Sequence, residues 1–261
     1  MRYAIYRRLR SVFSQRFLSR LGGARQLNSL KRWLMGSESM PTLMEGEITW
    51  EDLGFFFAAP MEIYLGAQSG GIENRICRLA RRTLLDASSP VTAIDVGANY
   101  GFISMVMGKS MDRMSRLISI EVDTNIAVVL EKTIAQNNLS CLSTIVPKKA
   151  GSKMEDDQIT LEGLLIGQPF PPVRFIKIDV DGGDYHVLVG TENLLRICTP
   201  IVVIEMTAYQ QEIYDMLKTL GYRYFIGQDN KPVVAGIWPA NLIASMEQVF
   251  IPARSSFGKA I

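Results

Sequence analysis

Two short segments place carboxylates and glycines directly after apolar runs. The first is AIDVGANYGF, residues 93–102, in which Asp95 precedes a turn bracketed by Gly97 and Gly101. The second is FIKIDVDGGD, residues 175–184, which contains Asp179 and Asp181. In doubly wound sheets, small molecules bind beyond the carboxyl ends of the strands, where turns of this kind lie. The two segments are therefore predicted to hold a ligand and to carry out chemistry on it.

The glycine spacing limits the ligand of the first segment. A dinucleotide-binding turn needs G-x-G-x-x-G, but Asn99 stands at the middle glycine position, and no Gly-Lys-Ser/Thr of a triphosphate-binding loop follows. A ligand with an adenosine end, a zwitterionic end and no phosphate fits, and S-adenosylmethionine is such a ligand. Asp95 can accept a hydrogen bond from its ammonium group. Backbone N–H groups of the turn can meet its carboxylate; the turn consists of Gly97, Ala98, Asn99, Tyr100 and Gly101.

Glu121 is the candidate for the ribose end of the same ligand. A ribose-binding acid is expected about twenty residues beyond the turn, at the end of the next strand. The segment LISIE, residues 117–121, ends in an acid at that distance. The alternative is an ordinary strand–turn–helix crossover with solvated acids, which the joint occurrence of Asp95 and Glu121 disfavours.

Asp179 and Asp181 are the candidate catalytic acids. Side chains two apart on a strand share a face, so both can project at the carboxyl edge beside the first turn. There they can bind a divalent cation, orient an acceptor hydroxyl or remove its proton. The alternative is that Asp181 caps the next helix and only Asp179 faces the pocket. Glu205, at the end of a later strand, is a weaker candidate.

His186 is the third catalytic candidate and the only histidine of the chain. It can act as a base after the two acids, and the alternative is an ordinary helix-surface or packing histidine. A single histidine excludes a multi-histidine metal centre. The three cysteines show no C-x-x-C spacing, so neither a disulfide framework nor a zinc site is predicted and a reducing compartment is expected; they are Cys77, Cys141 and Cys198.

The elements that must position these residues alternate along the chain. Strands are predicted at 91–96, 117–121, 143–149, 175–180 and 201–206, with helical segments between them, including one helix over 183–197. This order implies a mainly parallel α/β sheet with right-handed crossovers. RYFIG, residues 223–227, follows a further helix, and residues 232–238 and 247–251 are expected to complete the sheet by a hairpin. The 261 residues, 48% of them hydrophobic, suffice for one domain with a substantial core.

The N-terminal segment differs from the rest in charge. Nine of the 28 basic residues lie within positions 1–36 and no acid appears before Glu38, which leaves 19 bases against 26 acids in the remainder. We expect a basic helical arm at 1–45 and a helical lead-in at 46–90, with a loop-like stretch at 37–54. The arm lacks a membrane-spanning apolar run. Contact with an anionic membrane through residues 1–36, docking on the acidic body and a mitochondrial presequence are its open interpretations. A cytoplasmic location, with or without peripheral membrane contact, is expected.

Several of these segments together resemble the FkbM family of S-adenosylmethionine-dependent methyltransferases. They are AIDVGANYGF, the strand ending in Glu121, the AQNNL helix end, FIKIDVDGGDYHVLVG and PIVVIEM. The resemblance covers roughly residues 91–250 and marks 91–261 as the methyltransferase domain. It implies a seven-stranded class I methyltransferase sheet, Rossmann-like, with helices on both faces and a reversed hairpin strand at one edge.

The resemblance also implies the activity and the roles of the site residues. The expected reaction is O-methylation of a hydroxyl on a sugar, a glycan or a natural product. By position, the methionine end of S-adenosylmethionine would lie at Asp95, Gly97, Asn99 and Gly101, and the ribose at Glu121. Asp179 would border both the methyl donor and the acceptor. The chain departs from the family pattern at Asp181 and Asp184, where glutamate is usual.

Two other function classes stay open. One is a non-catalytic module that only binds S-adenosylmethionine. The other is a nucleic-acid methyltransferase, but the chain lacks the Asn/Asp-Pro-Pro-Tyr/Phe tetrad of adenine methylation, and its acidic body would repel a phosphate backbone. The expected partner is therefore a small-molecule or glycan acceptor rather than a nucleic acid.

Overall fold

The computed structural model describes residues 42–167 and 169–252. The basic N-terminal arm, with the membrane contact predicted for residues 1–36, lies outside the described residues. No helix within 42–167 or 169–252 combines the length and apolar character needed to cross a bilayer.

A seven-stranded sheet forms the centre of the described chain, in the order β10-β11-β9-β8-β3-β4-β5. Six of the strands run parallel, and β11 is antiparallel to both of its neighbours. The predicted fold class, a mainly parallel α/β sheet, is confirmed. The strands are β3 (Thr92–Val96), β4 (Arg116–Ile120), β5 (Leu142–Val146), β8 (Val173–Ile178), β9 (Ile201–Glu205), β10 (Tyr224–Gly227) and β11 (Asn241–Ser245).

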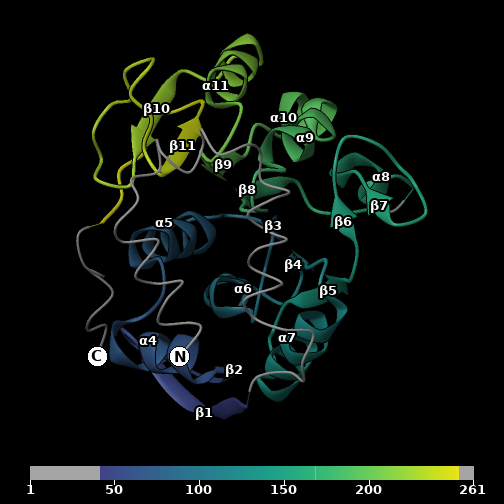
Figure 1. Ribbon diagram of the computed structural model, residues 1–261, viewed down its shortest axis with the longest axis vertical. Helices are drawn as coiled ribbons and strands as arrows, with labels where there is room; N and C mark the ends of the chain where they lie inside the picture. The colour runs from purple at the N-terminus through teal and green to yellow at the C-terminus, as the bar shows by residue number, and fades with distance from the viewer. Residues whose placement is uncertain (1–41, 168, 253–261) are drawn as a thin grey trace, which may run out of the picture. The chain divides into compact units, whose positions relative to one another are not determined.

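Helices cover both faces of this sheet (Figure 1). The covering helices are α5 (Asn74–Leu85), α6 (Phe102–Gly108) and α7 (Thr124–Gln136) on one face, and α8 (Leu161–Leu165), α9 (Asp184–Val189), α10 (Glu192–Cys198) and α11 (Gln210–Thr219) on the other. The inner strands are buried on both faces because successive apolar side chains alternate between the two cores, whereas the edge strand β5 is largely exposed. On β8, for example, Phe175 packs in the core that includes α5 and α6, whereas Ile176 packs in the core that includes α9 and α11.

A β-hairpin precedes the main sheet, where the sequence reads as a loop. It consists of β1 (Leu43–Trp50) and β2 (Leu53–Pro60) and is followed by α4 (Met61–Gly70). The expectation of a loop-like stretch over 37–54 is therefore wrong for the described part, and the helical lead-in expected over 46–90 is helical only from Met61 onward. The strand pattern is present, because Ile48 and Trp50 are buried and alternate with exposed Glu47 and Thr49, but the turn between the strands lacks glycine and asparagine.

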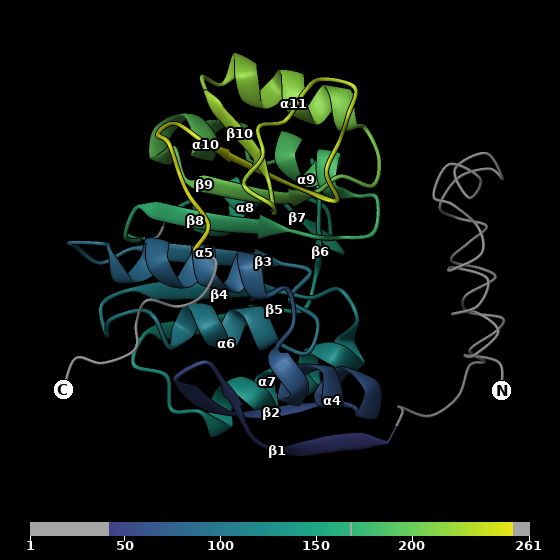
Figure 2. The ribbon, with the colours of Figure 1, turned by 90° about the vertical axis from the view of Figure 1, so that its left-hand side faces the viewer.

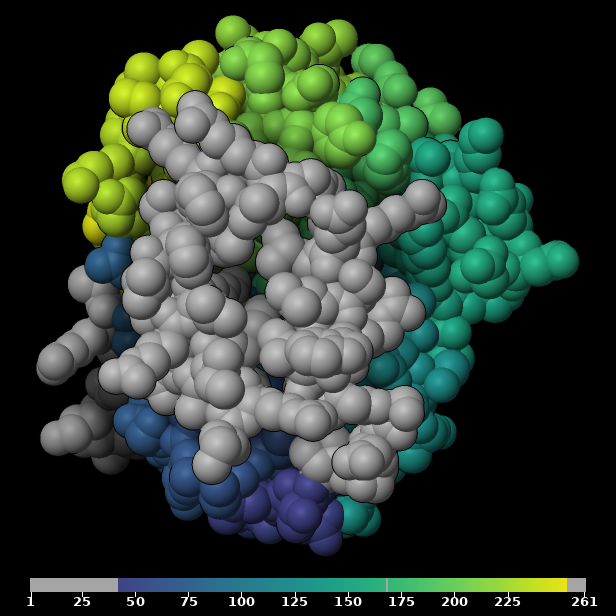
Figure 3. All heavy atoms as spheres, viewed as in Figure 1, coloured from purple at the N-terminus to yellow at the C-terminus, as the bar shows by residue number. Residues whose placement is uncertain are grey.

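Two basic side chains of α5 hold that turn in place. Arg78 Nε lies 2.6 Å from Glu51 Oε1, and the Arg81 guanidinium binds both carboxylate oxygens of Asp52. A bidentate arginine–carboxylate pair fixes orientation as well as distance. The hairpin lies at one end of the described chain, and α11 with the last strands lies at the other (Figures 2 and 3).

Two further predictions about the elements are corrected. The last strand of the sheet is β11 at Asn241–Ser245, and not residues 232–238 or 247–251. Its hairpin with β10 places the reversed strand between β9 and β10, one position inside the edge of the sheet.

The helix predicted over 183–197 is two helices, α9 and α10, separated at Gly190 and Thr191. A two-residue parallel pair, β6 (Lys149–Ala150) with β7 (Gln158–Ile159), lies between β5 and α8.

Candidate active site at the carboxyl edge of the sheet

Five residues form one row across the carboxyl edge of the sheet. The register pairs Val96 with Ile120 and with Ile178, and it pairs Ile178 with Ile204. The next residue of each strand therefore lies in the following row, where Asn241 of β11 pairs with Glu205. Residues in register on adjacent strands share a face. The row consists of Glu121, Gly97, Asp179, Glu205 and Asn241.

The glycine turn after β3 is shaped by its closeness to the end of β8. Gly97 has φ +77°, and a Cβ atom there would lie 1.8 Å from the carbonyl oxygen of Asp179. Gly101 has φ +90°, and its Cβ would lie 2.5 Å from Leu130 Cδ1. Both positions require glycine, because the backbone conformation and the available space both exclude a side chain. The turn is thus held against the strand that bears Asp179.

The backbone N–H groups at the start of this turn donate hydrogen bonds to other residues of the chain. The N–H groups of Gly97 and Ala98 both donate to the carbonyl of Ile120, at 2.9 and 3.0 Å. The N–H of Asn99, which has φ +53°, donates to Glu121 Oε2 at 2.9 Å. The prediction that these N–H groups meet a ligand carboxylate is therefore not supported at residues 97–99. Their role in the structure is to fix the turn against β4. Tyr100 is buried, and burial raises the pKa of its hydroxyl.

Glu121 has the geometry expected of a diol-binding carboxylate. It is 8% exposed, and its Oε1 accepts from the N–H of Asp123 at 2.9 Å while Oε2 accepts from Asn99. A carboxylate has about four lone-pair sites. Each oxygen therefore keeps one lone pair for a further donor, such as one of two neighbouring ribose hydroxyls.

Asp95 is more deeply buried than the sequence pattern indicates. It is 1% exposed, and its Oδ2 accepts from Ser104 Oγ at 2.6 Å, while Ser119 Oγ donates to Ser104. Its Oδ1 has no hydrogen-bond donor among the described residues. Burial raises the pKa of the Asp95 carboxyl. An unpartnered carboxylate oxygen is the group that an ammonium ion would satisfy, which agrees with the predicted role.

Lys177 is a site residue that the sequence analysis missed. It lies within β8, is 3% exposed, and its Nζ lies 2.9 Å from Asp179 Oδ2 and 3.7 Å from Glu73 Oε2. Burial alone would lower the pKa of this amine, but the carboxylates of Asp95, Asp179 and Glu73 outweigh it and hold the pKa above its ordinary value. A lysine inside an apolar strand, two residues before an acid, is the signal that could have identified it.

Asp179 and Glu205 lie side by side at the ends of β8 and β9. Burial is the largest cause that raises the pKa of Glu205 to about 8, followed by the charge of Asp179 and a hydrogen bond between the two carboxyl groups. Two adjacent carboxyl groups cannot both ionise easily, so the pair retains one proton near neutral pH.

Asp181 does not share a face with Asp179 through strand alternation, because β8 ends at Ile178. It is exposed and has φ +49° in the turn that follows. It does not cap α9 either, since the N-cap position is Gly183 without a side-chain hydrogen bond. The carboxylate that binds this turn is Asp184, which accepts from the N–H groups of Val180 and Gly182 and from Thr207 Oγ1 at 3.0 to 3.2 Å.

His186 lies on the exposed side of α9, among aromatic rings. Its ring centroid is 5.6 Å from that of Tyr209, and Tyr185 stacks on Tyr209 at 5.2 Å. This arrangement agrees with the alternative of an ordinary helix-surface or packing histidine. Within the ranges that the structure describes, no three His, Cys, Asp or Glu side chains are arranged to hold a metal ion.

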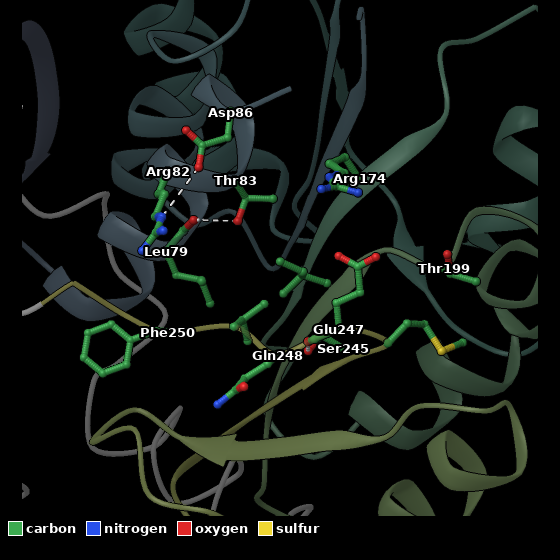
Figure 4. A pocket seen from close by; sticks show the side chains of 13 residues that line it. Leu79, Arg82, Thr83, Asp86, Arg174, Thr199, Ser245, Glu247, Gln248 and Phe250 are labelled. Carbon is green, nitrogen blue, oxygen red and sulfur yellow. Dashed lines mark hydrogen bonds and ion pairs between the residues drawn. The ribbon is translucent and has the colours of Figure 1, made fainter. Parts of the chain in front are cut away.

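A separate cavity of about 240 Å³ lies at the opposite edge of the sheet. It is bordered by Arg82 of α5, Asp86 directly after that helix, Arg174 at the start of β8, Thr199 before β9, and Ser245 at the end of the antiparallel β11 (Figure 4). These positions mark the amino ends of the parallel strands. The cavity is therefore distinct from the row of polar residues described above.

The comparisons with known proteins give one family match and a set of structural likenesses. The family model described as "Methyltransferase FkbM domain" matches residues 142–224, about a third of the chain. No curated protein sequence matches the chain.

The similar solved structures are all distant. A methyltransferase FkbM from Methylobacillus flagellatus KT has 17% identity and a TM-score of 0.45, over 63% of this chain and 47% of its own. An O-methyltransferase from Bacillus cereus in complex with SAH has 11% identity and a TM-score of 0.44, over 66% and 80%. The 16S rRNA N2 G1207 methyltransferase of T. thermophilus has 12% identity and a TM-score of 0.48, over 81% and 53%. The likeness thus spans about half of the Methylobacillus chain.

The strand order, the reversed strand β11 and the helices on both faces define a class I methyltransferase fold. Over residues 142–224 the chain matches the FkbM methyltransferase domain, which confirms the resemblance carried by its motifs.

Proposed function

We propose that this chain is an S-adenosylmethionine-dependent methyltransferase that O-methylates a hydroxyl of a sugar, a glycan or a natural product. The observation that carries the proposal is the polar row at the carboxyl edge, where Glu121, Asp179 and Glu205 lie on either side of the Gly97 turn. The FkbM match over residues 142–224 supports the same reaction class.

The charges of this edge suit the proposed cofactor. Asp95, Asp179 and Glu73 share one buried cation, Lys177, and Glu121 adds a further carboxylate at this edge, so the site is acidic. S-adenosylmethionine carries a sulfonium and an ammonium against one carboxylate, and is a net cation. A dinucleotide carries a diphosphate, which the acids would repel. In the proposed complex, Glu121 accepts from the ribose hydroxyls and Asp95 Oδ1 accepts from the ammonium.

The residues present account for the steps that a methyl transfer requires. The bound sulfonium supplies an activated methyl group, so the protein need only align the acceptor oxygen and remove one proton. Alignment can contribute about 7–11 kcal/mol in the best intramolecular models, and a positioned base about 10²–10⁴-fold. Asp179, beside the turn, is the residue proposed to border both reactants.

The same charges weigh against a nucleic-acid acceptor. Asp179, Asp181, Asp184 and Glu205 surround the acceptor side, and the buried amine of Lys177 is already paired with Asp179. A phosphate backbone would be repelled there. We therefore propose an acceptor that carries no negative charge at the atoms next to the methylated hydroxyl.

Calorimetry with the purified full chain tests the proposal. S-adenosylhomocysteine and S-adenosylmethionine should bind, and NAD should not. Tight binding of NAD together with no binding of S-adenosylhomocysteine would overturn the assignment. Binding without any transfer to hydroxyl-bearing acceptors would leave the non-catalytic module as the function.

A further inference from the structure

The carboxylates at the carboxyl edge differ in the donors that they receive. Asp95 accepts from Ser104, Glu121 from two backbone N–H groups, and Asp179 from Lys177. Asp184 accepts from two backbone N–H groups and from Thr207. Half-buried Glu205 is different, because no N–H or hydroxyl of the described residues donates to it and its hydrogen-bonding neighbour is the carboxyl of Asp179. Each of the other carboxylates thus accepts at least one hydrogen bond from an N–H, hydroxyl or amine group of the protein, whereas Glu205 accepts none within the ranges that the structure describes.

Asn241 lies directly opposite Glu205 on the neighbouring strand. The pair follows the ladder bond from the N–H of Met206 to the carbonyl of Ala240, at 2.9 Å, so it occupies a non-hydrogen-bonded position. At such positions Cα atoms are only about 4.5 Å apart and the side chains are closest. The side chain of Asn241 is therefore next to that of Glu205, on the same face of the sheet.

The side-chain oxygen of Asn241 accepts no hydrogen bond from the described residues. The residue is 6% exposed, and its Oδ1 has no hydrogen-bond donor among the described residues. Buried polar atoms without a partner are rare in folded proteins, and each calls for a specific explanation. A ligand hydroxyl is a donor of the required kind, and it would come to lie against Glu205 as well.

We infer that Asn241 and Glu205 form the acceptor site of the proposed methyl transfer, with Asn241 Oδ1 accepting from a hydroxyl of a neutral polyhydroxylated acceptor and Glu205 removing the proton from the hydroxyl that is methylated. This inference rests on the proposed function. Neither residue is part of the glycine turn or of the cofactor-side acids.

The proposed step balances in atoms and charge. The O–H bond of the acceptor breaks, and its proton moves to the Glu205 carboxylate. The acceptor oxygen forms a bond to the methyl carbon, and the carbon–sulfur bond breaks with its electron pair left on sulfur. The products are the methyl ether and S-adenosylhomocysteine. Because the pKa of Glu205 is raised to about 8, the ionised form that accepts this proton becomes the major form only as pH rises through about 8, and transfer should increase over that range.

Burial contributes most to the raised pKa of Glu205, and the charged groups that face it add to the shift. Asp179 lies beside it on β8, and the charges of Asp184 and Asp181 act on it from the turn before α9. Lys177 neutralises part of the charge of Asp179. Asn241 on β11 is uncharged, so in the proposed site it positions the acceptor without adding a negative charge beside Glu205. Replacing Asn241 by aspartate would add a negative charge and raise the pKa of Glu205 further.

The test uses the full chain, labelled S-adenosylmethionine and a panel of neutral methyl glycosides of glucose, galactose and mannose. Glu205→Gln should lower transfer about 10²–10⁴-fold and leave S-adenosylhomocysteine affinity unchanged. Asn241→Leu should lower transfer as well, and Asn241→Asp should shift the alkaline rise of the pH–rate profile to higher pH. Glu212→Gln, an exposed acid on α11, is the matched control and should transfer at the wild-type rate.

The outcomes separate the inference from the proposed function. Wild-type protein that does not bind S-adenosylhomocysteine overturns the proposed function itself. Protein that binds it but methylates none of the glycosides overturns the acceptor site. Transfer at the wild-type rate in Glu205→Gln removes Glu205 from the chemistry, and an unshifted pH profile in Asn241→Asp removes Asn241 from its positioning role. Melting temperatures of all variants establish that they are folded.

Discussion

Lys177 Nζ lies 2.9 Å from Oδ2 of Asp179, the residue that directly follows β8. The pairing sets the electrostatics of the edge, because Glu73 and Asp95 also act on the same amine. One buried cation thus serves three carboxylates, which leaves the edge acidic and suited to a cationic ligand. The lysine is structural in this arrangement, and Asp179 keeps its Oδ1 for other partners.

Lys177→Met is the first test of this arrangement. Removing one member of a buried ion pair costs about 3–5 kcal/mol, because the remaining charges stay buried without a partner. The free energy of unfolding in urea should fall by about this amount. Lys153→Met, at an exposed lysine, is the control and should change it little. Equal effects of the two substitutions would show that the Lys177 network contributes no stability.

Gly97→Ala tests the contact between the glycine turn and β8. An alanine Cβ would lie 1.8 Å from the Asp179 carbonyl oxygen, and φ +77° is unfavourable for any L side chain. The melting temperature should drop, and S-adenosylhomocysteine affinity should fall because the turn moves away from Glu121. Gly54→Ala is the matched control, since no atom lies within 4 Å of its added Cβ. A variant at Gly97 with wild-type stability and affinity would contradict the close approach.

The sequence predicts the parallel part of this fold because each strand carries its own evidence. The segments around Asp95 and Glu121 are apolar, β-branched and end in acids, and the register of β3 and β4 brings them together as expected. Residues whose role depends on long-range pairing were missed. Asn241 becomes informative only when the antiparallel register places it opposite Glu205, and Glu73 only when α5 packs on β8.

The prediction for Asp181 shows a different limit. Alternation along a strand is reliable only as far as the strand extends, and β8 ends before Asp179. The left-handed residue Asp181 turns the chain, so the carboxylate that stabilises this loop is Asp184. The sequence pattern D-x-D-G-G-D did not reveal which of the three acids binds this turn. That depends on the positive φ angles of Asp181 and Gly182 and on the hydrogen bond from Thr207 to Asp184.

Glu121→Ala measures the contribution of the ribose-side carboxylate. Each lost hydrogen bond to a charged group costs about 1.5–3 kcal/mol, which corresponds to a roughly ten- to a hundredfold loss of S-adenosylhomocysteine affinity. Calorimetry gives the dissociation constant, and the melting temperature controls for loosening of the turn at Asn99. An unchanged dissociation constant would remove Glu121 from the cofactor site. Glu131→Ala, at an exposed acid on α7, should leave the affinity unchanged.

The raised pKa of Glu205 predicts how stability depends on pH. The unfolded chain loses this proton near the ordinary glutamate value, 4.5, whereas the folded chain keeps it up to about 8. The contribution is therefore fully present below about 4.5 and is lost progressively as pH rises through about 8. The buried carboxyl groups of Asp95, Asp184 and Glu73, whose pKa values are also raised, act in the same direction, so the comparison must be made between variants.

Glu205→Gln keeps the shape of the protonated side chain and removes its ionisation. Its melting temperature should match that of the wild type near pH 5 and exceed it near pH 8.5. Glu212→Gln should follow the wild-type curve at both pH values, and a Glu205→Gln curve parallel to the wild type throughout would show that Glu205 ionises in the folded protein as it does in the unfolded chain.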